Sequence, residues 1–264
     1  MKSPRSTALA DGQVHLPRLA DVVAERIRDL ILRGELTDGE RLPPLDSLLE
    51  EFGVSGPSMR EALRILEAEG LIVVQRGSIG GAVIHRPTPK TAAYTLALVL
   101  RSQGTQKGDV AEALSLLAAL CAMLCARRPD RKSTVVRELR KANTRARRLI
   151  DADDLAFNDA MMEFHAILLQ QCPNDTMKLL SGALGSLWKS DARAWAKSAS
   201  EHGHYPTAEA RVAEIVEHEQ ITELISAGED LEAWSAMMEH LDETEIYTVV
   251  DATLLVNPQE VRLR

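Results

Sequence analysis

Three histidines in the second half of the chain have a spacing that can bring them together on neighbouring helices. His165 lies in the middle of a predicted helix, His218 lies two helices later, and His240 follows 22 residues on, across one helix hairpin. Three imidazoles converging inside a bundle, with a water or a ligand oxygen, suit zinc or a similar divalent metal. A second interpretation stays open, in which these histidines are buried polar groups that hydrogen-bond each other, water or an effector carboxylate.

The elements that would position these histidines are helices. Apolar residues recur at steps of three and four beyond Arg86, and breaks at Gly104, Pro129, Pro173 and Gly228 divide the pattern. The predicted helices lie near 90–103, 107–127, 131–150, 154–171, 175–199, 207–226 and 230–250. We therefore expect an all-α antiparallel bundle of about seven helices with room for a ligand between them. Its predicted limits are 93–252, between a linker at 87–92 and a tail at 253–264.

The first third of the chain has a different pattern. Amphipathic helices are predicted at 19–33 and from Leu45 to Phe52, and a third helix runs from a Ser55 N-cap to Glu69. Two β-branched runs, 71–74 and 82–84, bracket a glycine-rich tip and predict a hairpin. This order is typical of a winged helix-turn-helix over residues 18–86, preceded by a flexible arm at 1–17. The whole chain is thus predicted to be mainly α.

The third helix is the candidate reader of DNA. Ser58, Arg60 and Arg64 fall off its apolar face, towards the end that a recognition helix presents to the major groove. Arg76 with Gly77 and Ser78 forms the predicted wing tip, where glycines allow close approach to phosphates. Residues 1–88 carry 11 basic and 13 acidic residues, a net charge of −2. Contact with DNA must therefore come from a local cluster, supported by pairing of two copies.

Composition limits the class of protein, its cellular location and the state of its cysteines. Hydrophobic residues make up 45% and charged residues 27% of 264, as in soluble globular proteins. No run of 18 uncharged apolar residues and no signal-peptide core occurs, so we expect a cytoplasmic protein without a membrane partner. Cys121, Cys125 and Cys172 lack metal-binding spacing and are expected to be reduced, buried thiols.

The stretch from Leu19 to His85 resembles the DNA-binding domain of the GntR family of bacterial transcription regulators. The matching phrases are ILRGEL at 31–36, GERLP at 39–43, GVS at 53–55 and REALRILEAEGL at 60–71. The resemblance implies that Arg60 contacts DNA, with Ser55, Ser58 and Arg64 near phosphates or base edges and Gly77 at the wing. Family members often have arginines where Asp46 and Gly56 stand here, so two expected DNA contacts are missing.

The helical part resembles the effector-binding and dimerisation domain of the FadR subfamily, also called the FCD domain. Landmarks are Phe164-His165, Cys172-Pro173-Asn174, Glu217-His218 and His240-Leu241. The resemblance implies a metal held by histidines matching His165, His218 and His240 and by an aspartate four residues before the first. Met161 occupies that aspartate position here, so the only anionic ligand is lost.

The predicted effector pocket is apolar. Leu114 and Ala118 stand where the resemblance implies an arginine and a glutamate, and Met161 and Trp188 are expected near the three histidines. This composition favours a hydrophobic effector, such as a fatty acyl group, its CoA thioester or another hydrophobic acid. The alternative for most of these residues is ordinary bundle core.

We therefore predict a homodimeric transcriptional regulator, a repressor, that binds double-stranded operator DNA and is switched by this effector. The alternatives are a regulator that responds to a metal or a small carboxylate, and a metal-dependent hydrolase. No positioned general base or nucleophile motif accompanies the histidines, so an enzyme is not expected.

Overall fold

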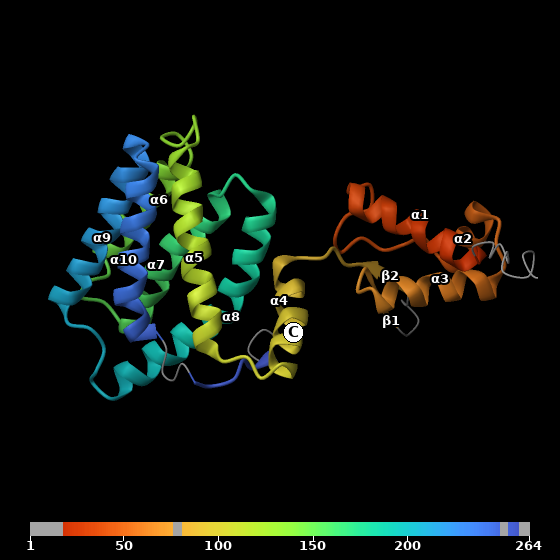
Figure 1. Ribbon diagram of the computed structural model, residues 1–264. Coiled ribbons are helices and arrows are strands. Elements are labelled where there is room, and N and C mark those ends of the chain that lie inside the picture. Colours follow the sequence, from red (N-terminus) through yellow and green to blue (C-terminus); the bar gives the residue numbers. More distant parts are fainter. Residues whose placement is uncertain (1–17, 76–80, 249–252, 259–264) are drawn as a thin grey trace, which may run out of the picture. The chain divides into compact units, whose positions relative to one another are not determined.

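The computed structural model describes residues 18–75, 81–248 and 253–258. The chain divides into two compact units, residues 1–87 and residues 88–264 (Figure 1). The predicted arm at 1–17 and the wing tip with Arg76, Gly77 and Ser78 lie outside the described residues.

The N-terminal unit consists of three helices and a hairpin. The elements are α1 (Leu19–Arg33), α2 (Leu45–Phe52), α3 (Gly56–Ala68), β1 (Ile72–Gln75) and β2 (Gly81–Ile84). The strands pair antiparallel with Ile72 opposite Ile84, and residue 41 bridges to Val83 on the other edge of β2. Ile27, Met59 and their buried neighbours on the strands form one core. This arrangement confirms the predicted winged helix-turn-helix order of elements.

Two local devices fix the ends of the N-terminal helices. Gly34 ends α1 in the left-handed region at φ 79°, a conformation that glycine adopts without steric cost. Ser55 begins α3 as its N-cap, and its Oγ accepts a hydrogen bond from the Ser58 amide at 3.4 Å. Pro57 lies in the first turn of α3, where its missing N–H costs nothing. Helix α3 therefore begins where the sequence predicts.

The C-terminal unit is a bundle of seven helices within the described residues, as predicted. They are α4 (Pro89–Ser102), α5 (Lys107–Ala126), α6 (Val135–Arg147), α7 (Asp154–Gln171), α8 (Asp175–Glu201), α9 (Ala208–Ala227) and α10 (Asp230–Thr248). Phe164, Leu139 and Ile221 are among the fully buried side chains of the main core. Cys121, Cys125 and Cys172 are free and fully buried, which confirms the prediction for the thiols.

The two ends of the helical unit are held by local contacts. α4 begins at Pro89, close to the start of the helix predicted near 90–103, because Thr88 and Thr91 form a capping box that starts the helix directly after Pro87. In the predicted tail, the Leu254 carbonyl accepts a hydrogen bond from the Lys107 amide at 2.8 Å. Val256 is buried against Ala93 and neighbouring residues of the bundle. Residues 254–256 therefore pack as part of the helical unit.

Candidate functional site

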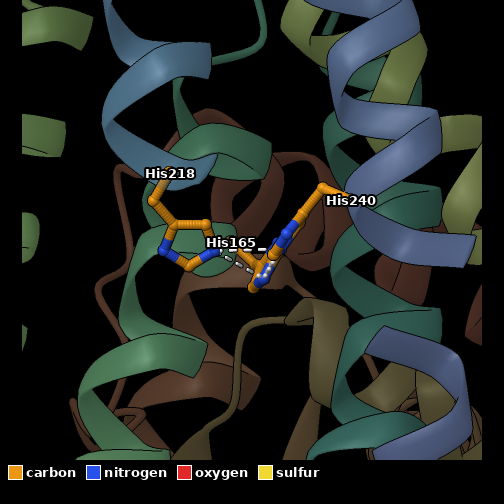
Figure 2. A group of neighbouring side chains, drawn as sticks. All are labelled: His165, His218 and His240. Carbon is orange, nitrogen blue, oxygen red and sulfur yellow. Dashed lines mark hydrogen bonds between the residues drawn. The ribbon is translucent and has the colours of Figure 1, made fainter. Parts of the chain in front are cut away.

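The three histidines converge in the structure. The Nε2 atom of His218 lies 3.3 Å from Nε2 of His165 and 3.0 Å from Nε2 of His240, and the latter two atoms are 3.4 Å apart. The side chains come from α7, α9 and α10, and Figure 2 shows them pointing toward one common point. We call this group the histidine triad. The sequence spacing thus correctly predicts that the three imidazoles meet inside the bundle.

Packing holds two of the rings in place. His218 stacks on Phe164 with ring centroids 3.7 Å apart and an angle of 10° between the planes. His165 and His240 stack at 5.2 Å and 15°. His218 and His240 are buried, with 1% and 2% of their surface exposed. Rings packed in this way cannot turn their nitrogens away from the common point without opening the core.

Burial keeps His165 and His218 uncharged at neutral pH. Burial, with a smaller contribution from neighbouring His240, lowers the pKa of His165 to about 3, and the pKa of His218 falls well below its usual value for the same reasons. A neutral imidazole has a lone pair on one ring nitrogen, which is the form that binds a metal. His165 and His218 are therefore electronically suited to a divalent cation.

A carboxylate orients the third histidine. Nδ1 of His240 lies 2.7 Å from Oε2 of Glu217, which comes from α9 one residue before His218. Because a carboxylate accepts the hydrogen bond, Nδ1 carries the proton and the lone pair of His240 lies on Nε2, which faces the other two histidines. Glu217 is therefore a positioning residue for His240. From the sequence, Glu217 was noted only as part of the landmark Glu217-His218, and no role was predicted for it. Its role could have been found from the common pairing of metal-binding histidines with carboxylates.

The distances within the triad fit a tetrahedral metal. Two nitrogens at 2.0–2.1 Å from zinc, separated by the tetrahedral angle, are about 3.3–3.4 Å apart. The observed separations run from 3.0 to 3.4 Å. Three nitrogen ligands leave the fourth position open for a water or a ligand oxygen. The donor set therefore fits a divalent metal without the aspartate that Met161 replaces.

Met161 itself is placed away from the cavity described below. Its side chain is buried, packed in a cluster with Phe157, Ala160 and Ile215. In this protein the position one turn before His165 thus contributes to the core, in a cluster that includes Ile215 of α9. Glu214, one turn before His218, is half-buried, and removal of its carboxyl from water raises its pKa to about 7.

An apolar cavity of about 510 Å³ lies between α5, α7 and α8. The predicted effector residues Leu114, His165 and Trp188 line it, and so does Ala118, whereas Met161, His218 and His240 do not. His165 is therefore the member of the triad that is shared with the cavity. The apolar wall agrees with the prediction that Leu114 and Ala118 replace the arginine and the glutamate that the resemblance implies.

Sequence reasoning missed part of the cavity wall. Gly182 and Gly185 of α8 line the cavity, and Lys178, Lys189 and Arg145 lie around it. A Cβ at Gly185 would meet only the Leu169 side chain, at 3.8 Å. Two glycines three residues apart in the middle of a long helix are a signal for space beside that helix, and this signal was available in the sequence.

Among the candidate DNA-binding residues, Arg60 and Arg64 are four residues apart and share one exposed face of α3. Ser55 and Arg60 are exposed, and Ser58 is half-buried with its Oγ 3.0 Å from Oγ of Ser55. Arg64 pairs with Glu61 at 2.5 Å, which reduces the charge it presents. The Arg60 guanidinium lies over Gly56, where an added Cβ would be 3.4 Å from its Nη atoms. The Cβ of a side chain at position 56 would therefore be in van der Waals contact with Arg60.

Two known family profiles match this chain, one in each of its two compact units. The profile described as bacterial regulatory proteins, gntR family, matches residues 19–80, and the profile of the FCD domain matches residues 109–243, more than half of the chain. The chain belongs to the GntR family and carries an FCD domain. This GntR-family chain thus combines a region matching the gntR profile with a region matching the FCD domain. The FCD match includes all three histidines of the triad.

Individual relatives agree with this assignment. The GntR-family chain is 47% identical over 73 residues to a protein of Mycobacterium gastri named HTH-type transcriptional regulator RmpR, which is 27% of each chain. It is 28% identical over 157 residues to the HTH-type transcriptional repressor NanR of Salmonella newport (strain SL254), which is 58% of each chain. The matching stretches thus span less than two thirds of these relatives.

A solved structure supports the fold. The GntR protein of Streptococcus agalactiae superposes with a TM-score of 0.62 and 22% sequence identity, covering 86% of this chain and 99% of that one. At this identity the similarity concerns the fold alone. It confirms the predicted combination of a winged helix-turn-helix and a helical C-terminal unit.

Proposed function

We propose that this regulator is a cytoplasmic repressor that binds operator DNA as a homodimer and responds to a small molecule in its helical unit. The observation that carries the proposal is the position of His165, which belongs both to the triad and to the wall of the apolar cavity. A ligand in the cavity can thereby place an oxygen at the open position of a metal held by the triad.

The triad is proposed to hold a divalent metal such as zinc through His165, His218 and His240. Such an ion supplies a positive charge that binds an anionic ligand group. Glu217 keeps His240 in the tautomer that this binding requires. Since Met161 contributes no carboxylate, the site keeps more positive charge for the effector than a site with an aspartate would.

The effector is proposed to be a hydrophobic acid, with a fatty acyl group as one example. Apolar and small side chains from α5, α7 and α8 form most of the wall, which suits an apolar body. A small carboxylate is the second candidate, favoured by the cations Lys178 and Lys189 at the cavity. In both cases the ligand shifts the population between dimers that fit the operator and dimers that do not.

The proposed activity is binding and not catalysis. Two carboxylates at the cavity, Asp159 and Glu163, are engaged by Arg193 and Arg145. Such ion-paired carboxylates are poor general bases.

Operator binding is the first test of the proposal. Arg60→Ala is expected to weaken binding to the DNA upstream of the protein's own gene about 10- to 100-fold, because a guanidinium that reads a base is lost. The measurement is a gel shift at several salt concentrations. Arg26→Ala, which removes an exposed arginine of α1, is the matched control and should retain the affinity. Unchanged binding by the Arg60 variant would count against the proposed DNA-binding face.

Thermal-shift measurements test the effector class. Saturating fatty acids or acyl-CoA thioesters of matching chain length are expected to stabilise the protein, by about 2.7 kcal/mol at a concentration of 100 times Kd. Gly185→Leu should abolish this shift because its side chain fills the cavity, whereas Gly185→Ala, which adds one methyl group, should retain most of it. Stabilisation by small hydroxy acids alone would favour the second candidate and contradict the first.

A further inference from the structure

The cavity between α5, α7 and α8 is polar at two places and apolar between them. Three residues join α7 to α8, so the two helices form an antiparallel hairpin along the cavity. Leu169 of α7 lies against Gly185 of α8, 3.8 Å from the position that a Cβ there would take. His165 is about one turn before Leu169, and Trp188 is about one turn after Gly185. His165 and Trp188 therefore lie at the same level of the cavity.

The level of His165 is the first polar end of the cavity. Lys189 follows Trp188 in the chain and lines the cavity with it. Lys189 forms no ion pair within the part of the chain that the structure describes, whereas the carboxylates of Asp159 and Glu163 each pair with an arginine. The charge left at this end is therefore positive, and it favours an acid group of a ligand.

Lys178 lies at the other end of the cavity. It is ten residues before Trp188 on α8, which is about 15 Å along the helix axis at about 1.5 Å per residue. The Lys178 ammonium group pairs with Asp175 at 3.1 Å, and the side chain of Asp175 is 95% exposed. An exposed pair of this kind is weak, and an ammonium group has three N–H donors. Lys178 can therefore also bind an acid group inside the cavity.

Between these two ends the wall is apolar. Gly182 and Gly185 leave room along α8, and Leu169 faces them from α7. Helix α5 adds Leu114 and Ala118 to the wall, and its mean hydropathy reaches 1.8 over 18 residues. A hydrocarbon chain suits this part of the cavity, because a polar group would lose its hydrogen bonds to water there.

We propose that the effector is an unbranched acid with a carboxylate at each end, an α,ω-dicarboxylic acid of about twelve carbons. One carboxylate lies at His165 and Lys189, and the other lies at Lys178. An extended chain advances about 1.25 Å per bond, so about eleven bonds between the two carboxyl carbons span about 14 Å, close to the separation of the two ends. This inference rests on the proposed function and narrows its effector, since one ligand then accounts for both the apolar wall and the lysines.

Isothermal titration calorimetry of the full-length protein tests the second acid group and the length of the chain. Dodecanedioic acid is expected to bind at least about 10-fold more tightly than dodecanoic acid, which has the same chain and a single carboxylate, because a charged hydrogen bond is added. Octanedioic acid is about 5 Å shorter and should lose this advantage, because it does not reach from His165 to Lys178.

A substitution at Lys178 tests where the second carboxylate binds. Lys178→Met should bind dodecanedioic acid about 10-fold more weakly than the wild type and should bind dodecanoic acid equally well. Lys197→Met is the matched control, because Lys197 is another exposed lysine of α8 with a carboxylate neighbour, Glu201, and it should retain the preference for the diacid. An equal loss of both affinities in Lys178→Met would show a merely structural role and overturn the inference.

A charge reversal gives a gain of binding that a folding defect cannot imitate. Lys178→Glu is expected to bind ω-aminododecanoic acid at least about 10-fold more tightly than the wild type does, because the ammonium group of this ligand meets the new carboxylate. A wild-type protein that binds dodecanoic acid as tightly as dodecanedioic acid would overturn the inference and leave the hydrophobic acid of the proposed function standing. A wild-type protein that binds none of these acids would overturn both.

Discussion

Replacing Arg211 with methionine is expected to lower the free energy of unfolding of the helical unit by about 3–5 kcal/mol, as for other buried ion pairs that lose one partner. The Arg211 guanidinium donates to the carbonyls of Ile150 at 2.9 Å, Pro206 at 3.0 Å and Ala152 at 3.3 Å, and to the Asp154 carboxylate. Methionine fills much of the volume but leaves these acceptors without a donor.

The aromatic neighbours of Arg211 add to the expected loss. Its guanidinium carbon lies 5.1 Å from the ring centre of Phe157 and 4.8 Å from that of Tyr205. The measurement is urea unfolding followed by tryptophan fluorescence, which reports on this unit because all three tryptophans lie beyond residue 88. Arg140→Met is the control, since its pair with Glu223 is exposed and should contribute less than about 1 kcal/mol. Equal effects of the two substitutions would contradict this account of Arg211.

Replacing His218 with alanine is expected to abolish metal binding. The wild-type protein, purified with zinc present and then dialysed, should retain about one ion per chain, and the variant should retain close to none. The reason is that two nitrogens, those of His165 and His240, do not hold an ion against dialysis. The measurement is elemental analysis of both proteins at the same concentration, with circular dichroism as the check on folding.

Two further variants test whether any loss of metal is specific to the histidine triad and its positioning residue. His204→Ala removes an exposed histidine outside the triad and should leave the metal content unchanged. Glu217→Gln keeps the size of the side chain but weakens its hold on the His240 proton, and should reduce metal affinity about 10- to 100-fold without abolishing binding. A wild-type protein without metal under these conditions would sink the metal proposal and leave the triad as a hydrogen-bonded polar group.

Most helix limits could be predicted because local signals determine them. The limits of α1 and α2 agree with the predicted ones, since apolar periodicity and the glycines at positions 34 and 53 act within one or two turns. The sixth helix is shorter than the predicted range 131–150. It begins at Val135 because the Asp130 carbonyl accepts hydrogen bonds from the Thr134 and Ser133 hydroxyls in a series of turns.

Side-chain direction within the bundle could be predicted only in part. The three histidines were found because metal ligands have a recognisable type and spacing. Met161 was expected beside the cavity, but its direction depends on how α7 is rotated against α9, and that rotation is set by packing far away in sequence. The cavity cations Lys178 and Lys189 were missed for the same reason, since their spacing resembles that of any solvated helix face.

The two faces of α5 have a mechanical consequence. A single rigid helix carries the cavity wall at Ala118 and the exposed leucines at positions 116 and 120, so neither surface can shift alone. A ligand that rolls α5 by a few degrees to make room for itself also turns the leucines by the same angle. Ligand binding in the cavity would then alter the outer surface of the helical unit directly, with no intervening chain of contacts.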